Sequence, residues 1–157
     1  VVPQELRNRL GIAVARRTYK AYRDLLASPR WRRLAAAGAR TQRLLWASTG
    51  TKDPGASDTL YIEALAAPET INTIPDRTLL AFADHGHVSG VMPVDGGDAE
   101  DTLAAFRRVG VDDPAIATQL QRQGTASFDK SWQDLLACIA SKSAVLEQVA
   151  HTNAGQR

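Results

Sequence analysis

Polar and charged side chains follow an apolar run at residues 44–47 without any transition. Ser48 and Thr49 carry hydroxyl groups that can donate to an anion. Gly50 lets the backbone approach a ligand closely, and Lys52 adds a positive charge. In α/β proteins such groups gather beyond the carboxyl ends of parallel strands. The pattern predicts an anion-binding loop after a buried strand, although a solvated turn has the same composition.

Three other residues carry side chains that could bind a metal or act as a nucleophile. His85 and His87 lie on either side of a glycine and close to Asp84, but no third ligand is evident, so a helix-end role is favoured over a metal site. Cys138 lies on an apolar helical stripe, where a buried structural thiol is expected. It is the one cysteine of the chain, which excludes an internal disulfide and fits a reducing cytoplasm.

The composition is that of a globular protein: 157 residues, 44% hydrophobic and 23% charged. A net charge of +2 is too small to indicate a nucleic-acid partner. The arginine run at residues 30–33 is read as a solvated outer helix, because the apolar stripe opposite is continuous. No apolar run approaches the roughly 20 residues of a membrane span. We therefore expect a cytoplasmic protein without a nucleic-acid or membrane partner.

The elements that would position the anion loop alternate between helix and strand. Residues 4–27 predict an amphipathic helix, and Ser28 and Pro29 end it and begin a second helix that stops at Gly38. Strands are predicted at residues 42–47, apolar on both faces, and at 70–74. The apolar stripe of the first helix is expected at Leu6, Leu10, Val14, Tyr22 and Leu25.

More helices are predicted around and after the second strand. Ser57 is a candidate cap of a helix of about ten residues, and Asp76 is a candidate cap of a helix that ends near His85. After a loop over 87–97, helices are expected at 98–109, at 113–123 with Asp113 as cap, and from Thr125 or Ser127 onward. The last has an apolar stripe of Phe128, Trp132, Leu135, Leu136 and Ile139. The order of elements favours an α/β protein with a parallel sheet.

Several segments together resemble the bacterial transaldolases. The most specific block runs from Leu45-Trp46-Ala47-Ser48-Thr49-Gly50-Thr51-Lys52-Asp53-Pro54 through Ser57-Asp58-Thr59-Leu60-Tyr61 to Ala67-Pro68-Glu69-Thr70-Ile71-Asn72-Thr73-Ile74-Pro75. Asp84-His85-Gly86, the helix 128–136 and the helix segments 6–9 and 15–19 extend the resemblance over residues 4–140. Gly55-Ala56 and the glycine-rich loop 92–98 depart from the family pattern.

The resemblance implies the C-terminal part of a (β/α)8 TIM barrel, helix-rich and with about two parallel strands, the seventh and eighth. Such barrels take about 250 residues, so we expect the N-terminal half of the same barrel as a partner. The start at Val1, without Met or a signal-like segment, suggests a chain cut from a longer one. Residues 1–150 are expected to be a single domain and 151–157 a frayed tail.

The resemblance also implies a reaction, the transfer of a dihydroxyacetone unit between sugar phosphates of the pentose phosphate pathway. A lysine of the family forms a Schiff base with the donor, and the imine accepts the electrons of the breaking carbon–carbon bond. That lysine belongs to a Lys-Ile-Pro-Ala-Thr-like motif, which this chain lacks, as it lacks the family's proton-transferring Asp and Glu. No catalytic residue, cofactor or metal is expected in this span, and the span alone should be inactive.

Ser48 and Lys52 match the family's serine and basic residue that hold the substrate phosphate. A lysine in a Gly/Pro turn lacks the desolvated setting of a Schiff-base lysine, so Lys52 is not expected to be one. The other lysines, Lys20, Lys130 and Lys142, are expected to be solvated. The resemblance thus implies sugar-phosphate substrates. The alternative is a non-catalytic remnant that binds a sugar phosphate or a partner chain.

Overall fold

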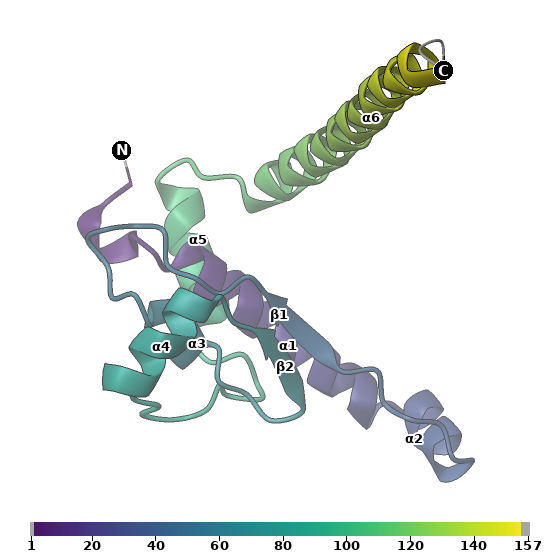
Figure 1. The fold of residues 1–157 in the computed structure, drawn as a ribbon. Coiled ribbons are helices and arrows are strands. Elements are labelled where there is room, and N and C mark those ends of the chain that lie inside the picture. Colours follow the sequence, from purple (N-terminus) through teal and green to yellow (C-terminus); the bar gives the residue numbers. More distant parts are fainter. Residues whose placement is uncertain (1, 155–157) are drawn as a thin grey trace. The chain divides into compact units, whose positions relative to one another are not determined.

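The computed structural model describes residues 2–154 of the chain (Figure 1). The chain divides into two compact units, Val1–Val111 and Asp112–Arg157. A single domain over residues 1–150 stays a prediction. Within residues 2–154 no helix is long and apolar enough to cross a membrane.

Unit 1 contains both strands and all but one of the helices labelled in Figure 1. Its elements, in chain order, are a 3-10 helix η1 (Gln4–Leu6), α1 (Leu10–Ala27), α2 (Pro29–Ala36), β1 (Leu44–Ala47), α3 (Leu60–Ala64), β2 (Thr70–Thr73), α4 (Asp76–His85) and α5 (Ala99–Arg108). The order confirms the predicted helix–strand alternation. The predicted junction at Ser28 is also confirmed, because its side chain accepts a hydrogen bond from the Trp31 amide.

β1 and β2 form a parallel pair in which Leu44 lies opposite Thr70 and Ala47 opposite Thr73. Side chains alternate between the two faces of the pair. Trp46 is buried on one face, whereas Leu45 and Ile71 on the other are 45% and 42% exposed. Both faces of β1 are apolar, as predicted, but one is uncovered within the described residues. Parallel sheets are almost always covered on both faces.

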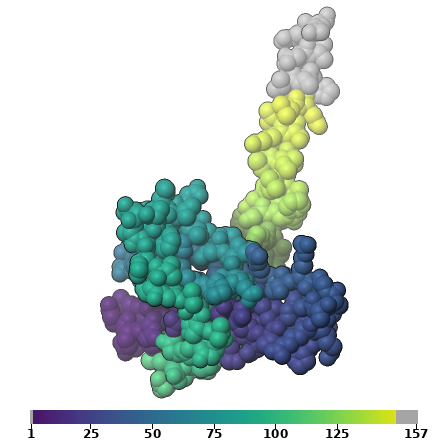
Figure 2. Space-filling view, turned by 90° about the horizontal axis from the view of Figure 1, so that it is seen from below, coloured from purple at the N-terminus to yellow at the C-terminus, as the bar shows by residue number. Residues whose placement is uncertain are grey.

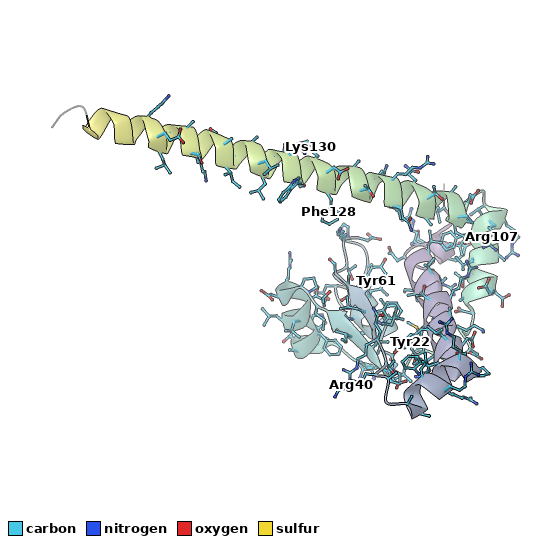
Figure 3. All side chains as sticks on the ribbon, turned by 90° about the vertical axis from the view of Figure 1, so that its right-hand side faces the viewer. Tyr22, Arg40, Tyr61, Arg107, Phe128 and Lys130 are labelled. Carbon is cyan, nitrogen blue, oxygen red and sulfur yellow. The ribbon has the colours of Figure 1, made fainter. Side chains whose placement is uncertain are left out.

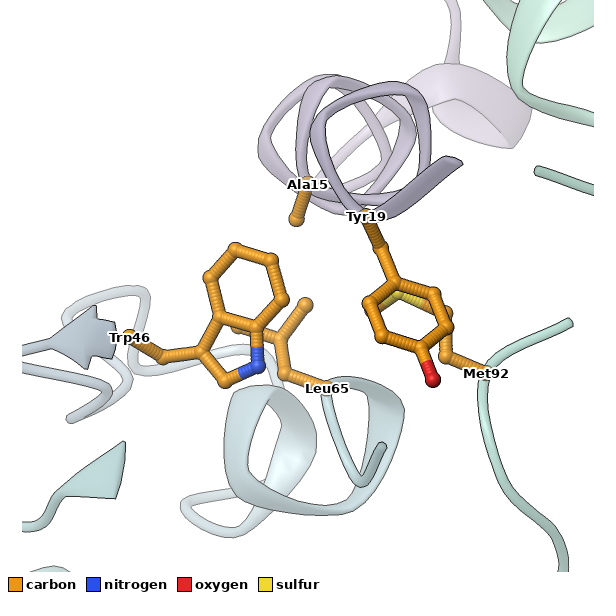
Figure 4. Close-up of a cluster of buried hydrophobic side chains, with 5 residues drawn as sticks. All are labelled: Ala15, Tyr19, Trp46, Leu65 and Met92. Atoms are coloured by element: carbon orange, nitrogen blue, oxygen red, sulfur yellow. The ribbon is translucent and has the colours of Figure 1, made fainter. Parts of the chain in front are cut away.

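The core of unit 1 lies between α1 and the covered face of the sheet (Figure 4). Tyr19 of α1 is fully buried, and Trp46 of β1, Leu65 after α3 and Met92 of the loop between α4 and α5 pack with it. The Tyr19 hydroxyl donates to the carbonyl oxygen of Pro68 at 3.3 Å. One helix, one strand and two loops therefore share a single apolar cluster, and it holds β1 against α1.

α1 also packs against α5, and this second contact changes which side of the helix is buried. The predicted stripe is wrong at Val14 and Leu25, which are 41% and 61% exposed. The buried residues of α1 are Ala13, Ala15 and Tyr19. Alanine allows close approach on both sides, so a helix enclosed between two neighbours does not bury a single stripe of large side chains.

Two other helices in unit 1 differ from their predictions at their first turns. α3 begins at Leu60 and is only five residues long, because Leu65 ends the helix before β2 begins. Ser57 does not cap it; its hydroxyl instead accepts from the Thr59 amide at 3.3 Å. Asp76 lies in the first turn of α4 rather than at its cap, which is Pro75.

Unit 2 is built on one continuous helix, α6 (Asp113–Ala154). The predicted break near residue 124 is wrong, since Gly124 lies inside the helix with no neighbouring atom that a side chain would meet. A glycine costs about 1 kcal/mol within a helix but does not end it. The cap is Asp112 rather than Asp113, because the Asp112 carboxylate accepts from the Ala115 amide at 2.9 Å.

The predicted apolar stripe of α6 is exposed in the described part of unit 2. Phe128 and Trp132 are 80% and 57% exposed, and Figure 3 shows Phe128 and Lys130 on opposite sides of the helix. Cys138 is exposed too, so its expected burial is wrong. Of the tail predicted from residue 151, residues up to Ala154 are helical and 155–157 lie outside the described residues.

Candidate functional site

The loop that follows β1 begins with a residue in an unusual backbone conformation. Ser48 has φ 55°, in the left-handed region that non-glycine residues rarely adopt. Its amide donates to the Thr73 hydroxyl at 3.1 Å, and that hydroxyl donates to the Trp46 carbonyl at 3.3 Å. Such strain persists only where surrounding contacts enforce it, and it is common at ligand sites. The end of β2 thus holds the first turn of the loop in place.

Two further contacts join this loop to β2 and to the segment after it. The buried Thr49 hydroxyl donates to the Asn72 side-chain oxygen at 2.7 Å. Gly50 lies so close to the next segment that a Cβ there would be 3.2 Å from Pro75 Cγ and 3.4 Å from Thr78 Oγ1. The two loops at the carboxyl ends of the strands are therefore packed on each other, as expected from a parallel pair.

The second half of the loop lines a cavity of about 610 Å³ together with the first turn of α4. Lys52 comes from the loop and Arg77 from α4, and both side chains are exposed. The remaining lining residues are Thr51, Asp53, Pro54, Ala56, Ser57, Asp58 and Thr78. The Thr51 hydroxyl is buried, and the structure gives it no hydrogen-bond partner.

Both carboxylates of the cavity accept hydrogen bonds from neighbouring groups. Asp53 accepts from the Asn8 side chain at 2.7 Å and from the Gly55 amide at 2.9 Å, and these bonds hold the pKa of Asp53 below its usual value. Asp58 accepts from His85 Nε2 at 2.9 Å, which lowers the pKa of Asp58 and raises that of His85. Lys52, by contrast, has no hydrogen-bond or ion-pair partner among the described residues.

The structure places only one of the two predicted phosphate-binding residues in this cavity. Lys52 lines the cavity, whereas Ser48 is exposed at the end of β1 and is not among the cavity's lining residues. Arg77 was missed, because its place within a helix gave no sign of a ligand site. The arrangement of one unpaired lysine, one arginine and a free hydroxyl suits a small anion such as a phosphate group.

Neither His85 nor Lys52 lies in a setting suited to metal binding or to Schiff-base formation within the described residues. His85 is the last residue of α4, and its ring binds the carboxylates of Asp84 and Asp58. No group of three metal-ligating side chains occurs within residues 2–148, where side chains are described. Lys52 is exposed and so lacks the desolvated setting that a Schiff-base lysine needs. Lys20, Lys130 and Lys142 are exposed, as predicted.

A two-strand parallel unit with helices after each strand, and an anion-type cavity at the strand ends, is typical of part of a (β/α)8 barrel. The family model described as "Transaldolase/Fructose-6-phosphate aldolase" matches residues 2–139. The chain belongs to this family, whose fold is the TIM barrel.

Individual relatives agree with the family model. The chain is 48% identical over 137 residues to a transaldolase of Parafrankia sp. (strain EAN1pec), an alignment that covers 87% of this chain and 37% of the relative. It is 48% identical over 135 residues to transaldolase 1 of Streptomyces coelicolor, with 85% and 35% covered. For a transaldolase of Mycolicibacterium smegmatis the identity is 45% over 132 residues, with 83% and 36% covered. The chain thus spans just over a third of the length of these relatives.

Proposed function

We propose that this chain is part of a transaldolase and supplies the end of the active site that binds the substrate phosphate. The observation that carries the proposal is the Lys52 cavity at the carboxyl ends of two parallel strands, in a chain of the transaldolase family. Phosphate sites recur in TIM barrels in the loops after the seventh and eighth strands. A phosphate dianion there would receive the charge of Lys52, with Ser48 as a hydroxyl donor from the start of the same loop.

The chemistry proposed for the complete protein is the transfer of a dihydroxyacetone unit between sugar phosphates. A lysine from another part of the barrel would form the Schiff base with the donor ketose. This chain's residues would fix the phosphate, and so the distance of the donor carbonyl from that lysine. The span by itself would bind substrate weakly and would not catalyse the transfer.

The proposed partner of the chain is the rest of its own barrel. Within the described residues β1 and β2 each have a single neighbour, so the outer edge of each strand is unpaired. The uncovered face presents the apolar side chains of Leu45 and Ile71. Unpaired edges next to an exposed apolar face favour pairing with further strands.

The test is transfer from fructose 6-phosphate to erythrose 4-phosphate by the protein in which the barrel is complete. Borohydride reduction in the presence of donor should trap the imine on a peptide outside residues 1–157. A folded complete barrel without transfer activity would contradict the proposal, as would an imine trapped on Lys52. Saturable sugar-phosphate binding without any trapped imine would instead support the alternative, a non-catalytic binding protein.

A further inference from the structure

A second cationic region lies before β1, and the proposed transaldolase site does not use it. Every charged side chain between residues 28 and 43 is an arginine: Arg30, Arg32, Arg33, Arg40 and Arg43. The first three belong to α2 and the last two to the segment between α2 and β1. All of them are exposed. Figure 2 shows this part of the chain, in blue, gathered at one end of unit 1.

These arginines differ from those of α1 in having no acidic partner. Arg16 pairs with Asp98, Arg17 with Glu100 and Arg23 with Glu69. Within the described residues, in contrast, no guanidinium group between residues 28 and 43 forms an ion pair or a side-chain hydrogen bond. The positive charge of this region is therefore uncompensated, whereas the three arginines of α1 each pair with a carboxylate.

Two of the unpaired arginines line a cavity of about 730 Å³. One wall is the segment with Arg40 and Arg43, and the other is formed by Tyr22 of α1 and the turn before β2. The lining residues are Tyr22, Ala39, Arg40, Thr41, Arg43, Glu69 and Thr70. Figure 3 labels Tyr22 and Arg40 at the same end of unit 1. The volume is within the range of small-molecule sites.

The turn that forms the wall opposite the arginines is fixed by hydrogen bonds from side chains. Glu69 has φ 60°, a strained conformation for a residue with a side chain. The turn is fixed by hydrogen bonds from the Tyr22 hydroxyl to the Glu69 carbonyl at 3.3 Å and from the Thr70 hydroxyl to the Ala67 carbonyl at 2.7 Å. The Glu69 carboxylate, the one acidic group of the cavity, is paired with Arg23. It therefore opposes an incoming anion less than a free carboxylate would.

This cavity is distinct from the Lys52 cavity. Arg40 and Arg43 precede β1 and Thr70 begins β2, whereas Lys52 and Arg77 follow the two strands. Because the strands are parallel, residues that precede them and residues that follow them lie at opposite ends of the pair. The two cationic cavities thus lie at opposite ends of the strand pair.

We propose that the cavity of Arg40 and Arg43 binds a small anion that carries two or more phosphate groups. A guanidinium group holds a phosphate through two parallel hydrogen bonds, so two arginines on one short segment match two adjacent phosphate groups. The arginines of α2 add to the local positive potential and favour a highly charged ligand. The site would bind this ligand independently of the transfer reaction.

The test measures pyrophosphate binding to the complete barrel protein by titration calorimetry at low salt. Wild type should bind saturably and more tightly than it binds inorganic phosphate. The Arg40→Gln/Arg43→Gln variant should raise Kd at least about tenfold, because each charge-assisted contact is worth more than one decade. The charge-matched control Arg108→Gln/Arg122→Gln, at two exposed arginines outside the cavity, should leave Kd within about twofold.

Two more measurements keep the result interpretable. Lys52→Ala should weaken only pyrophosphate binding at the proposed transaldolase site and leave the Kd of the tighter binding, the one that Arg40→Gln/Arg43→Gln weakens, unchanged. Loss of this tighter binding in Lys52→Ala would overturn the proposal. Pyrophosphate should also protect Arg40 and Arg43 of the wild-type protein from phenylglyoxal, a readout that needs no variant to fold. Absence of saturable binding in wild type would overturn the proposal, and so would equal losses in the charge-matched control. Duplex RNA that binds through these arginines while pyrophosphate does not would overturn it as well.

Discussion

Lys52 is the residue on which the proposed phosphate site depends. In the complete protein, Lys52→Ala removes a charge-assisted contact worth about 1.5–3 kcal/mol. The loss should appear as a KM raised roughly 10- to 100-fold for phosphorylated donors, with dihydroxyacetone itself little affected. Steady-state kinetics with both donors measures this split. Lys142→Ala, at an exposed lysine of α6, is the control and should change neither KM. Equal losses with both donors would mean that Lys52 supports the fold or the chemistry.

Gly86, directly after α4, lies at a position where the neighbouring atoms leave no room for a side chain. A Cβ at this position would lie 2.1 Å from Phe82 Cδ2 and 2.6 Å from the Phe82 carbonyl oxygen. The ring could rotate, but the carbonyl is part of the helix, so we expect Gly86→Ala to cost about 1–3 kcal/mol of unfolding free energy. Gly90→Ala, where a Cβ would meet no atom within 4 Å, should change it by less than about 1 kcal/mol. Chemical denaturation of both variants measures the difference.

At the scale of elements, the end of α4 is tied to the segment before α3 by an ion pair that titrates. The His85 ring binds Asp58 at 2.9 Å, and the contact raises the pKa of His85 and lowers that of Asp58. The contribution of a raised histidine pKa is complete below the pKa of the unfolded chain, near 6.5, and is lost as pH rises through the raised value. The contribution of Asp58 is lost only in acid, below its lowered pKa.

The ion pair should therefore stabilise the protein between about pH 5 and pH 6.5 and lose its effect above the raised pKa of His85. We expect the unfolding free energies of wild type and His85→Gln to differ most near pH 5 and to converge as pH rises through the raised pKa of His85. Urea denaturation across this range measures the difference. His87→Gln is a matched control, because the His87 contact to Glu63 is made by its backbone amide. A difference independent of pH would mean that His85 acts through packing alone.

At the scale of the whole molecule, the uncovered face of the sheet is the feature that a complete barrel would change. Leu45 is 45% exposed in this chain. Further strands that cover this face would bury it, so that Leu45 would become a core residue. In the complete protein we expect Leu45→Asp to cost about 3 kcal/mol or more, since it buries an unpaired charge. Gln42→Asp, in the exposed segment just before β1, should cost less than about 1 kcal/mol. Thermal and urea denaturation of the complete protein would show the difference, and equal small effects would argue against strands covering this face.

Local sequence patterns were sufficient for the order of the elements in unit 1 and for the family. β1 is a short apolar run, and Ser28 followed by proline marks a helix boundary. The polar residues after β1 form the loop that the sequence predicted. These features depend on hydrogen bonds and dihedral preferences of residues a few positions apart, so they can be predicted from the sequence alone. The family assignment likewise needed only the segments around residues 44–75 and their order.

Contacts between distant residues were decided only by the tertiary structure. Arg77 lies in one cavity with Lys52 because the two strands are parallel, and the bond between Asp58 and His85 spans 27 residues. The buried residues of α1 result from its packing against both the sheet and α5. A single apolar stripe in the sequence does not predict two such contacts. The unpaired state of Arg40 and Arg43 is also a property of the fold, because a sequence shows where charges occur and not which charges meet.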